Sequence, residues 1–559
     1  MDNGAYQCSD TSTMSLTPQR REKGNTRELE PLKGPAKPRF EEGSDHYAKQ
    51  DTRSQVVVVV TRSSTSTWNE FLFPSDRPRQ VQILRWENIA IPFCYLVVGT
   101  MQGLVRPLLN VYPIELGATE AQQTTLSAVV TLPATLKIVF GFISDNSCIY
   151  GYRRKPYMLF GWLLVSSLMA ILCLSYDLTM TYDEYGRPLP PVNAPSLQFL
   201  SVTFFLFGIG MWMADVMADS LVAQKVCLEP DATRGSLQST CYALRFFGLM
   251  VAAPLSTYLY SEHAATSVIY LMLGVPLTMP VLIHVLQEER TTIPPVVEQL
   301  KEIWKTASSR CVWQPMAFIY VFNLLQLPNA AWKQFLQTVL HFTAEELNAL
   351  LVASYILLYV GTMVYKYCFL NTSWRHIYQF CILTNAFLSG LQLLLIRGNT
   401  FDLSPFLFAL GDDAFAEFLA GIQFLPITIM MVSLVPAGSE GASYAMFTTY
   451  WNSAMLLSPA VATSLLRIWD VSKETLEADE LDGLFKLSLL TTFIQTLPVL
   501  LIFWLPRDRD ELYALGQKPY SGSAVGGGLF LGVLFSSMAY AFIVSGLNIF
   551  DPGWDAESR

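Results

Sequence analysis

Charged residues are scarce in this chain: they make up only 15% of its 559 residues, against about a quarter in a typical soluble domain. Histidine is also rare, with five isolated residues, and the nine cysteines are scattered without a C-x-x-C pair. The cysteine pattern indicates no disulfide framework, and neither residue type shows a metal-ligand spacing. We therefore expect a protein without a metal site that is not a soluble globular domain.

Familiar catalytic signatures are missing as well. The sequence contains no G-x-S-x-G, no H-E-x-x-H and no P-loop. A membrane-embedded enzyme would need such a constellation, so we expect that the chain is not an enzyme and holds no cofactor. The net charge of −9 sums over both sides of any membrane, says little about partners and gives no reason to expect nucleic acid.

Long apolar runs are what the chain has in abundance. Hydrophobic residues make up 52% of it, in runs of about 20 residues that are long enough to cross a hydrocarbon core about 30 Å thick. We predict an all-α polytopic membrane protein embedded in a lipid bilayer. Twelve spans are expected, at about 89–111, 122–143, 157–174, 197–221, 236–258, 266–286, 313–335, 347–367, 374–395, 414–434, 443–466 and 484–505.

The remaining segments suggest the domain organisation. Residues 1–80 are rich in Ser, Thr, Arg, Glu and Pro, which predicts a disordered cytoplasmic tail. The polar stretch 287–312 is expected to be a cytoplasmic connector between two six-helix halves, 89–286 and 313–505. The run 524–550 opens on three glycines and is long enough for a thirteenth helix. A tail helix lying against the bundle is the alternative.

The turns between spans indicate orientation and an internal repeat. Lys and Arg are enriched in the turns after spans 2, 4, 6, 8 and 12, which places both ends of the twelve-helix core in the cytoplasm. The basic turns at 145–154 and 366–375 correspond to each other, as do the turns at Arg234 and Glu440. Two homologous halves are typical of alternating-access transporters.

The stretch from Leu132 to Tyr157 organises the rest of the chain. An apolar run that carries a single lysine, Lys137, ends at Asp145 and then turns through a basic loop into a second apolar run. Asp145 stands at the C-terminal end of the first helix, where a negative charge is unfavourable against the helix dipole. We therefore expect it to have a partner, either a nearby arginine or the start of another helix.

Three ionisable residues are predicted within later spans. Asp215 and Asp219 lie four residues apart, on one face of the fourth span. Arg245 lies about 13 Å inside the fifth span at 1.5 Å per residue. Charges at such depth need a partner or a cavity, and Asp215 is our first choice as the partner of Arg245. A charge-balanced network that only shapes the bundle is the alternative to a binding role.

Other positions give weaker indications. The spacing Gly99-x-x-x-Gly103 favours close helix approach. Arg106 is expected to extend to the membrane interface, with substrate contact as its second role. Pro328 predicts a break in the seventh span, of the kind that often borders binding sites. Lys333 is expected to be an interface anchor.

The motif G-x-x-x-D followed by G-x-R-R-K-P resembles the loop between the second and third helices of major facilitator transporters. With Lys137 upstream and the insert 147–150, it resembles the folate–biopterin transporter family of that superfamily. The D-x-x-x-D pair, the Gly235-Ser236-Leu237-Gln238-Ser239 segment and the P-x-G-x-E-G turn at Glu440 are similar to that family too. The resemblance implies a major facilitator fold. It also implies a conformational gate formed by Gly141, Asp145, Gly151, Arg153, Arg154 and Glu440, although helix capping alone would explain Glu440.

The resemblance also implies a secondary active transporter whose cargo is folate, a reduced folate or biopterin. Lys137 and Arg245 are then the cations expected to bind cargo carboxylates, because Arg binds carboxylate bidentately. Asp215, or Asp219 beside it, is expected to carry a coupling proton. Another cargo such as S-adenosylmethionine, whose positive charge would favour Asp215 over Arg245 as the substrate-binding residue, stays open, as does a nutrient receptor that does not transport. The plasma membrane is the default location, with an organelle membrane as the alternative.

Overall fold

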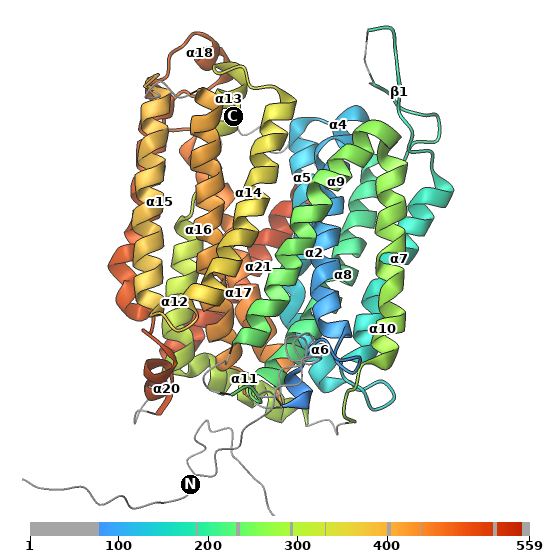
Figure 1. The fold of residues 1–559 in the computed structure, drawn as a ribbon, viewed down its shortest axis with the longest axis vertical. Helices are drawn as coiled ribbons and strands as arrows, with labels where there is room; N and C mark the ends of the chain where they lie inside the picture. The colour runs from blue at the N-terminus through green and yellow to red at the C-terminus, as the bar shows by residue number, and fades with distance from the viewer. Residues whose placement is uncertain are drawn as a thin grey trace, which may run out of the picture. The chain divides into compact units, whose positions relative to one another are not determined.

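The computed structural model describes residues 78–185, 188–230, 235–290, 295–329, 331–399, 404–436, 438–517 and 522–550. In this part of the chain, eleven helices are long and apolar enough to cross a membrane. Most of the long helices run side by side (Figure 1). The predicted all-α, multi-pass architecture is confirmed. Residues 1–77 of the predicted tail lie outside the described residues, and so does Arg234.

The N-terminal half, as predicted from 89 to 286, is a sequence of helices with several breaks. Its elements are α2 (Ala90–Leu104), α3 (Arg106–Asn110), α4 (Tyr112–Glu115), α5 (Glu120–Thr131), η2 (Leu132–Leu136), α6 (Lys137–Asn146), α7 (Lys155–Ser175), α8 (Leu197–Val226), α9 (Ser236–Gly274), η4 (Pro276–Thr278) and α10 (Met279–Val285). Helix α9 contains the predicted fifth span and, after a kink at Ala264, whose φ is 67°, the first part of the sixth, which continues through η4 into α10. The loop after α7 forms a short antiparallel pair, β1 (Thr181–Tyr182) with β2 (Pro188–Leu189).

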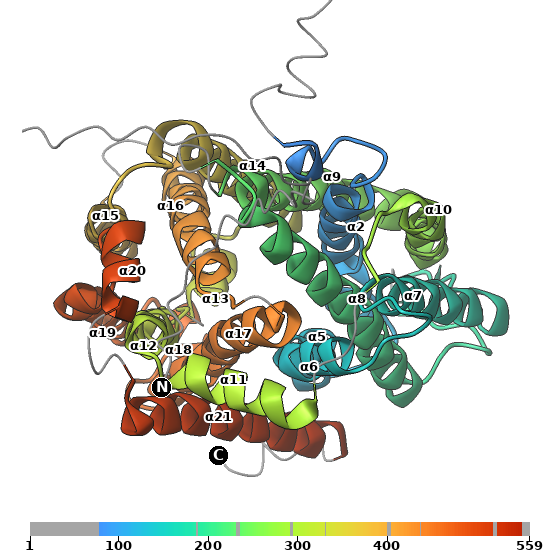
Figure 2. The same ribbon diagram turned by 90° about the horizontal axis from the view of Figure 1, so that it is seen from below.

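The C-terminal half, as predicted from 313 to 505, lies beside it (Figure 2). Its elements are α12 (Arg310–Leu325), α13 (Trp332–Thr338), α14 (Ala344–Val364), the π-helical turn η5 (Tyr365–Phe369), α15 (Trp374–Ile396), α16 (Pro405–Ser433), α17 (Glu440–Leu465), α18 (Lys473–Glu477), α19 (Asp482–Thr496) and η6 (Leu497–Trp504). Helix α16 begins at Pro405, so the tenth span begins earlier than predicted and Asp413 lies in a helix.

Two predicted spans differ from the eleven long apolar helices. The seventh is interrupted: α12 ends at Leu325 and α13 begins only at Trp332, so the break predicted at Pro328 is confirmed. Side chains bind the carbonyls in the break, with Ser458 donating to Gln326 and Gln495 donating to Leu327, each at 2.7 Å. The eleventh is α17, a helix of 26 residues rich in hydroxyl side chains and mostly buried in the bundle.

Prolines break the first two spans at the depth where the site is built. Pro107 has no N–H for the carbonyl of Gly103, and the Ser256 hydroxyl donates to that carbonyl instead, at 3.1 Å. Pro133 lies in the 3-10 segment η2, between α5 and α6. Both interruptions place a basic residue at the beginning of the next helical segment, Arg106 in α3 and Lys137 in α6.

Small residues bring the helices of the N-terminal half close together. A Cβ at Gly99 would meet the backbone of Arg245, and a Cβ at Gly103 would meet the backbone of Ala252 and Ala253. Helices α2 and α9 therefore pack backbone to backbone, as the Gly99-x-x-x-Gly103 spacing predicted. This close contact holds the α9 segment around Arg245 against α2.

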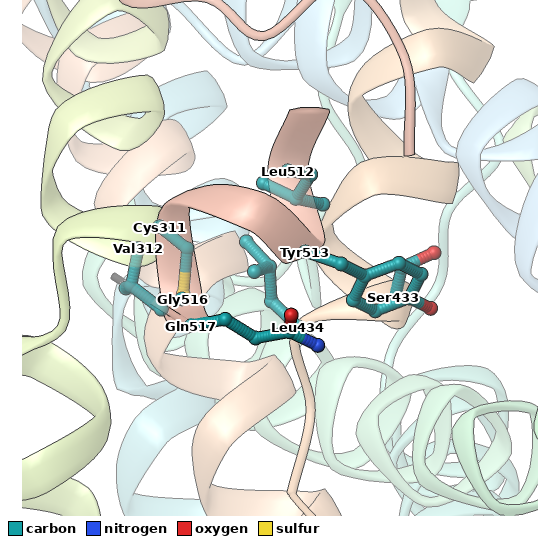
Figure 3. A pocket seen from close by; sticks show the side chains of 8 residues that line it. All are labelled: Cys311, Val312, Ser433, Leu434, Leu512, Tyr513, Gly516 and Gln517. Carbon is teal, nitrogen blue, oxygen red and sulfur yellow. The ribbon is translucent and has the colours of Figure 1, made fainter. Parts of the chain in front are cut away.

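Besides the short helix η1 (Arg79–Val81), three helices outside the two predicted halves complete the described chain. Helix α11 (Val296–Ser308) lies in the predicted connector, and α20 (Arg509–Gln517) follows η6; neither was foreseen. Helix α20 packs on the ends of α12 and α16 around a small pocket between Cys311, Ser433 and Tyr513 (Figure 3). The pocket holds about 30 Å³, which is room for about one or two water molecules and not for a larger ligand.

The last helix, α21 (Ala524–Phe550), covers the predicted thirteenth span. It contacts α5 and η2 of the N-terminal half and α12 and α17 of the C-terminal half, and it lies alongside α11 (Figure 2). The Ser537 and Tyr320 hydroxyls share a hydrogen bond of 2.6 Å, and the rings of Phe530 and Tyr450 lie 4.3 Å apart. That this helix crosses the membrane stays a prediction.

Candidate functional site

A buried ion cluster lies between helices of the N-terminal half. Lys137 on α6 donates to the Asp215 carboxylate on α8 at 2.6 Å, and the Arg245 guanidinium on α9 donates to the other oxygen of that carboxylate at 3.2 Å. All three residues are buried. The expected pairing of Arg245 with Asp215 is present. The Asp215 carboxylate therefore forms ion pairs with two cations.

Asp219 adds a second acid to this cluster, one helical turn along α8. Its Oδ1 accepts a hydrogen bond from the Tyr95 hydroxyl on α2, and its Oδ2 lies 3.9 Å from Lys137 Nζ. The two acids thus lie on one face of α8, as their spacing predicted. The cluster joins α2, α6, α8 and α9.

Trp212 covers the two cations of the cluster. Its ring lies 4.7 Å from Lys137 Nζ and 5.4 Å from Arg245 Cζ, and its indole N–H donates to the Val130 carbonyl at 3.2 Å. That hydrogen bond fixes the ring, and the cation–π contacts stabilise both charges in a low-dielectric setting. Trp212 was not among the residues predicted for the site, although it lies three residues from Asp215 on the same helical face.

A cavity of about 810 Å³ lies between the two halves, within the usual range for ligand pockets. Lys137 and Arg245 line it, and the two acids lie behind them. The other cavity-lining groups include Arg106, Glu417, Gln102, Asn110, Asn323, Gln326, Asn385, Gln423, Asn452, Tyr242, Phe246, Phe322, Tyr378, Phe424 and Trp451. The cavity is therefore polar at several points and aromatic at others.

Aromatic rings from both halves form one cluster on the cavity wall. Phe424 of α16 lies 4.7 Å from Tyr242 and 5.0 Å from Phe246, both on α9. The ring of Trp451 on α17 lies 5.1 Å from that of Phe424. The rings of Tyr242 and Phe246 each meet the Phe424 ring edge to face, an arrangement that aromatic quadrupoles favour. Such a wall suits a flat aromatic ligand.

The break in the second span binds α17 of the opposite half. The N–H of Ile138 donates to the Thr449 hydroxyl at 3.1 Å, and the Asn452 amide donates to the Ala134 carbonyl at 3.5 Å. In a regular helix this N–H and this carbonyl would pair with each other. The irregular backbone thus provides polar contacts between the halves beside the cavity, as broken membrane helices do elsewhere.

Asp145 joins the two halves at one end of the bundle, which we call the Asp145 end. Its carboxylate accepts hydrogen bonds from the Arg154 guanidinium and, at 2.7 Å, from the Ala442 N–H in the first turn of α17. Arg154 also donates to the Ser144 hydroxyl. Asp145 and Arg154 are both completely buried. Both kinds of partner expected for Asp145 are present.

Arg153 and Glu440 extend this contact. Arg153 Nη1 donates to the Gly438 carbonyl at 3.4 Å, and Glu440 Oε2 lies 3.9 Å from Arg153 Nη2 and 3.8 Å from Arg154 Nη2. Glu440 Oε1 accepts from the Gly438 N–H at 2.9 Å. Glu440 is the first residue of α17, where its charge is favourable against the helix dipole.

Three of the motif glycines have steric reasons to be glycine. A Cβ at Gly141 would collide with the Gly441 carbonyl, and a Cβ at Gly441 would meet the Arg154 guanidinium and the Asp145 carboxylate. Gly151 has a φ of +84°, in the left-handed region that glycine tolerates. Helices α6 and α17 therefore contact each other through their backbones at the Asp145 end.

The other motifs behind the family resemblance, without the D-x-x-x-D pair, meet at this same end. The Gln238 amide, near the start of α9, donates to the Tyr444 hydroxyl on α17 at 2.9 Å. Lys366 donates to Thr240 at 2.9 Å, which adds another contact between the halves. The structure brings the predicted gate residues together, and it brings Lys137, Asp215, Asp219 and Arg245 together in a separate cluster. Their functional roles stay predictions.

Comparisons with known proteins agree with this architecture. The BT1 family profile matches residues 99–513. A folate-biopterin transporter from Synechocystis is 25% identical over 440 residues, which cover 78% of this chain and 84% of that protein. Folate transporter 1 from Plasmodium falciparum is 21% identical over 349 residues, covering 60% of this chain and 64% of that protein.

Solved structures support the fold. The proton:xylose symporter XylE, a major facilitator protein, has a TM-score of 0.55 at 12% identity and covers 77% of this chain and 98% of its own. The human organic anion transporter MFSD10 has a TM-score of 0.50 at 13% identity, covering 75% of this chain and 100% of its own. The predicted major facilitator fold is confirmed. The protein is a multi-pass membrane transporter, not an enzyme, and it belongs to the BT1 family.

Proposed function

We propose that the protein is a secondary active transporter that moves folate or a related pteridine, such as biopterin, across its membrane by alternating access, with protons as the coupling ion. The observation that carries this proposal is the cavity between the halves, which has aromatic rings on its wall and the ion cluster at one side. Relatives named as folate and folate-biopterin transporters support the choice of cargo. The plasma membrane is the proposed location, with an organelle membrane as the alternative.

The aromatic cluster is suited to the pteridine ring. A pteridine is flat and aromatic, and it carries hydrogen-bond donors and acceptors around its edge. Phe424 and Trp451 offer faces and edges for ring contacts, and the amides of Asn385 and Gln423 line the same cavity. A mostly apolar wall with a few placed polar groups is the usual composition of a small-molecule site.

The ion cluster is the proposed site of proton coupling. Asp215 pairs with both Lys137 and Arg245 in this structure, and Asp219 is the second acid of the cluster. A proton on Asp215, or on Asp219 beside it, would remove a negative charge and leave the two cations less neutralised. They would then attract the carboxylates of an anionic cargo, so proton and anion would bind together. Intramembrane acids beside cations commonly serve as such relays.

The polar contacts at the Asp145 end support alternating access. Asp145, Arg153 and Arg154 on one half bind the start of α17 on the other. The cavity extends away from this end, toward Asn110 on α3. We propose that this conformation is closed at the Asp145 end and that rocking of the halves breaks these contacts to admit or release cargo there.

Uptake of radiolabelled folic acid into proteoliposomes, with and without an inward proton gradient, tests this proposal. Arg245→Ala is run beside Lys333→Ala, which removes an exposed cation on α13. We expect gradient-stimulated uptake by the native protein and by Lys333→Ala, and none by Arg245→Ala. A thermal unfolding curve for each variant separates loss of transport from loss of folding.

Three results would contradict the proposal at different points. Folate uptake that ignores the gradient would overturn proton coupling. Uptake of S-adenosylmethionine without uptake of folate or biopterin would keep the transporter and overturn the pteridine cargo. Folate binding without flux would favour a receptor over a transporter.

A further inference from the structure

Arg106 is a cation in the cavity wall that the proposed mechanism does not use. It is the first residue of α3, after the break between α2 and α3, and it is half-buried. Its guanidinium lies 5.3 Å from the ring centre of Tyr355 on α14, in the opposite half. Across the part of the chain that the structure describes, Arg106 makes no hydrogen bond and no ion pair.

The other two cavity cations are in a different electrostatic state. Lys137 and Arg245 share the carboxylate of Asp215, and Trp212 covers both. A cargo carboxylate that approached either one would have to compete with a buried ion pair. Arg106 contacts the face of the Tyr355 ring and forms no hydrogen bond or ion pair within 4 Å among the described residues, so no carboxylate is bound to its donors. It is the better anchor for an anion in this conformation.

Arg106 is also placed where cargo can reach both it and the deeper cluster. Gln102 lies one helical turn before it and accepts a hydrogen bond from Arg245 Nε at 3.2 Å. Asn110 lies one turn after it, and all of these residues line the same cavity. Arg106 is therefore the next cation along the cavity wall from Arg245, in the direction that leads away from the Asp145 end.

Glu417, on the other half, carries a charge opposite in sign to that of Arg106. It lies on α16, lines the same cavity, and makes no hydrogen bond or ion pair within 4 Å in the described chain. Arg106 and Glu417 attract each other across the cavity without forming a direct pair. A carboxylate bound at Arg106 would be repelled by Glu417. Glu417 therefore weakens the binding of carboxylated ligands and leaves the binding of an uncharged ligand unaffected.

We propose that Arg106 binds a carboxylate of the cargo and that Glu417 opposes this binding, so that the two residues together set the preference between carboxylated and uncharged pteridines. The inference rests on the proposed function and deepens it. Folate carries two carboxylates on its glutamate portion, whereas biopterin carries none. A guanidinium presents paired donors that match a carboxylate, and a lysine in its place would keep the charge but not this fork.

Equilibrium binding of folate and of biopterin to the purified full-length chain in nanodiscs tests the assignment. We expect Arg106→Gln to weaken folate binding about tenfold or more, because a hydrogen bond to a charged group is lost. Biopterin binding is expected to stay within about twofold. Glu417→Gln is expected to act in the opposite direction, tightening folate binding and leaving biopterin unchanged. Lys333→Gln is the matched control and should change neither.

Two further variants keep the test decisive. Arg106→Lys retains the charge and should lose less folate affinity than Arg106→Gln. If the glutamine variant unfolds, the lysine variant still tests the assignment, because it should bind folate more weakly than the native protein and biopterin equally well. Arg245→Gln leaves Lys137 to neutralise Asp215 and should weaken both ligands, because it disturbs the cluster and not one carboxylate contact. Selective loss of folate binding at Arg106 with a gain at Glu417 supports the assignment.

The contrary outcomes are distinct from one another. Arg106→Gln binding folate as tightly as the native protein, or losing folate and biopterin equally, would overturn the role of Arg106 while the proposed pteridine transport stands. A native protein that binds neither folate nor biopterin would overturn the proposed cargo and, with it, this assignment. Tighter binding of both ligands to Glu417→Gln would overturn the role of Glu417 in discrimination.

Discussion

An Asp145→Asn substitution removes a charge at the point where α17 contacts the N-terminal half. The carboxylate accepts from the Ala442 N–H, 297 residues along the chain, at 2.7 Å, and from Arg154 in its own half. When the halves separate at this end, the bond to Ala442 is lost, whereas the pair with Arg154 moves as a unit. The substitution is therefore expected to disfavour the conformation that is closed at the Asp145 end.

The magnitude of this shift follows from the hydrogen bond to the Ala442 N–H, which is the one contact of Asp145 that differs between the two conformations. A hydrogen bond to a charged group contributes about 1.5–3 kcal/mol. Because 1.4 kcal/mol is a factor of ten, complete loss of this bond would shift the conformational equilibrium by about 10- to 140-fold, and the neutral asparagine oxygen, which still accepts a weaker hydrogen bond, gives a shift below that limit. The pair with Arg154 is weakened in both conformations, so it lowers the free energy of unfolding without adding to this shift.

Cysteine accessibility measures the shift. Ser443 is buried on α17, one residue after Ala442, and Ser443→Cys changes the side chain little. In a background where the other cysteines are replaced by serine, a membrane-impermeant maleimide added on the Asp145 side should label Cys at this position faster in the Asp145→Asn variant. Asp479→Asn, an exposed acid on the loop after α18, is the control. Equal labelling rates in Asp145→Asn and in the control would refute the reasoning.

Three further predictions address contacts elsewhere in the bundle. Gly141→Val places a branched side chain against the Gly441 carbonyl, so the Asp145 end should fail to close and transport should fall at least about tenfold, measured as uptake beside Gly390→Val, a glycine with open space around it. Trp212→Phe loses the hydrogen bond to Val130, and about 1 kcal/mol of stability with it, and weakens the cover over Lys137; thermal unfolding and proton-stimulated uptake should both decline, and unchanged values would contradict the role given to the ring. Tyr320→Phe removes the hydrogen bond to Ser537, so the protein should lose about 1 kcal/mol of stability, seen as a lower Tm in a scan of the purified protein; an unchanged Tm would show that this bond does not hold α21.

Local properties of the chain were sufficient to predict most of the fold. Length and hydropathy located the membrane helices, because a span needs about 20 apolar residues in sequence. Pro328 predicted a break for a reason that acts within a few residues, namely a missing N–H. The amphipathic helices α11 and α20 were missed, since their many charged residues resemble a polar loop when only composition is considered.

The site residues were predictable only where they are charged residues inside apolar runs of the sequence. Asp215, Arg245 and Lys137 stand out in this way, and the structure brings them together. The partner of Asp145 on α17 was not predictable as a residue, because a backbone N–H leaves no trace in the sequence. Arg106 and Glu417 were visible as charges, but their common cavity depends on packing between helices from different halves.

Helix α21 has a consequence for the speed of transport. Its hydrogen bond to Tyr320 and its ring contact with Tyr450 attach it to the C-terminal half, while it also packs on α5 and η2 of the N-terminal half. If the halves rock as proposed, α21 travels with α12 and α17 and slides over α5 once in each direction per cycle. A stronger contact between α21 and α5 then slows the conformational change. Substitutions along that surface would alter the transport rate while leaving the affinity for cargo unchanged.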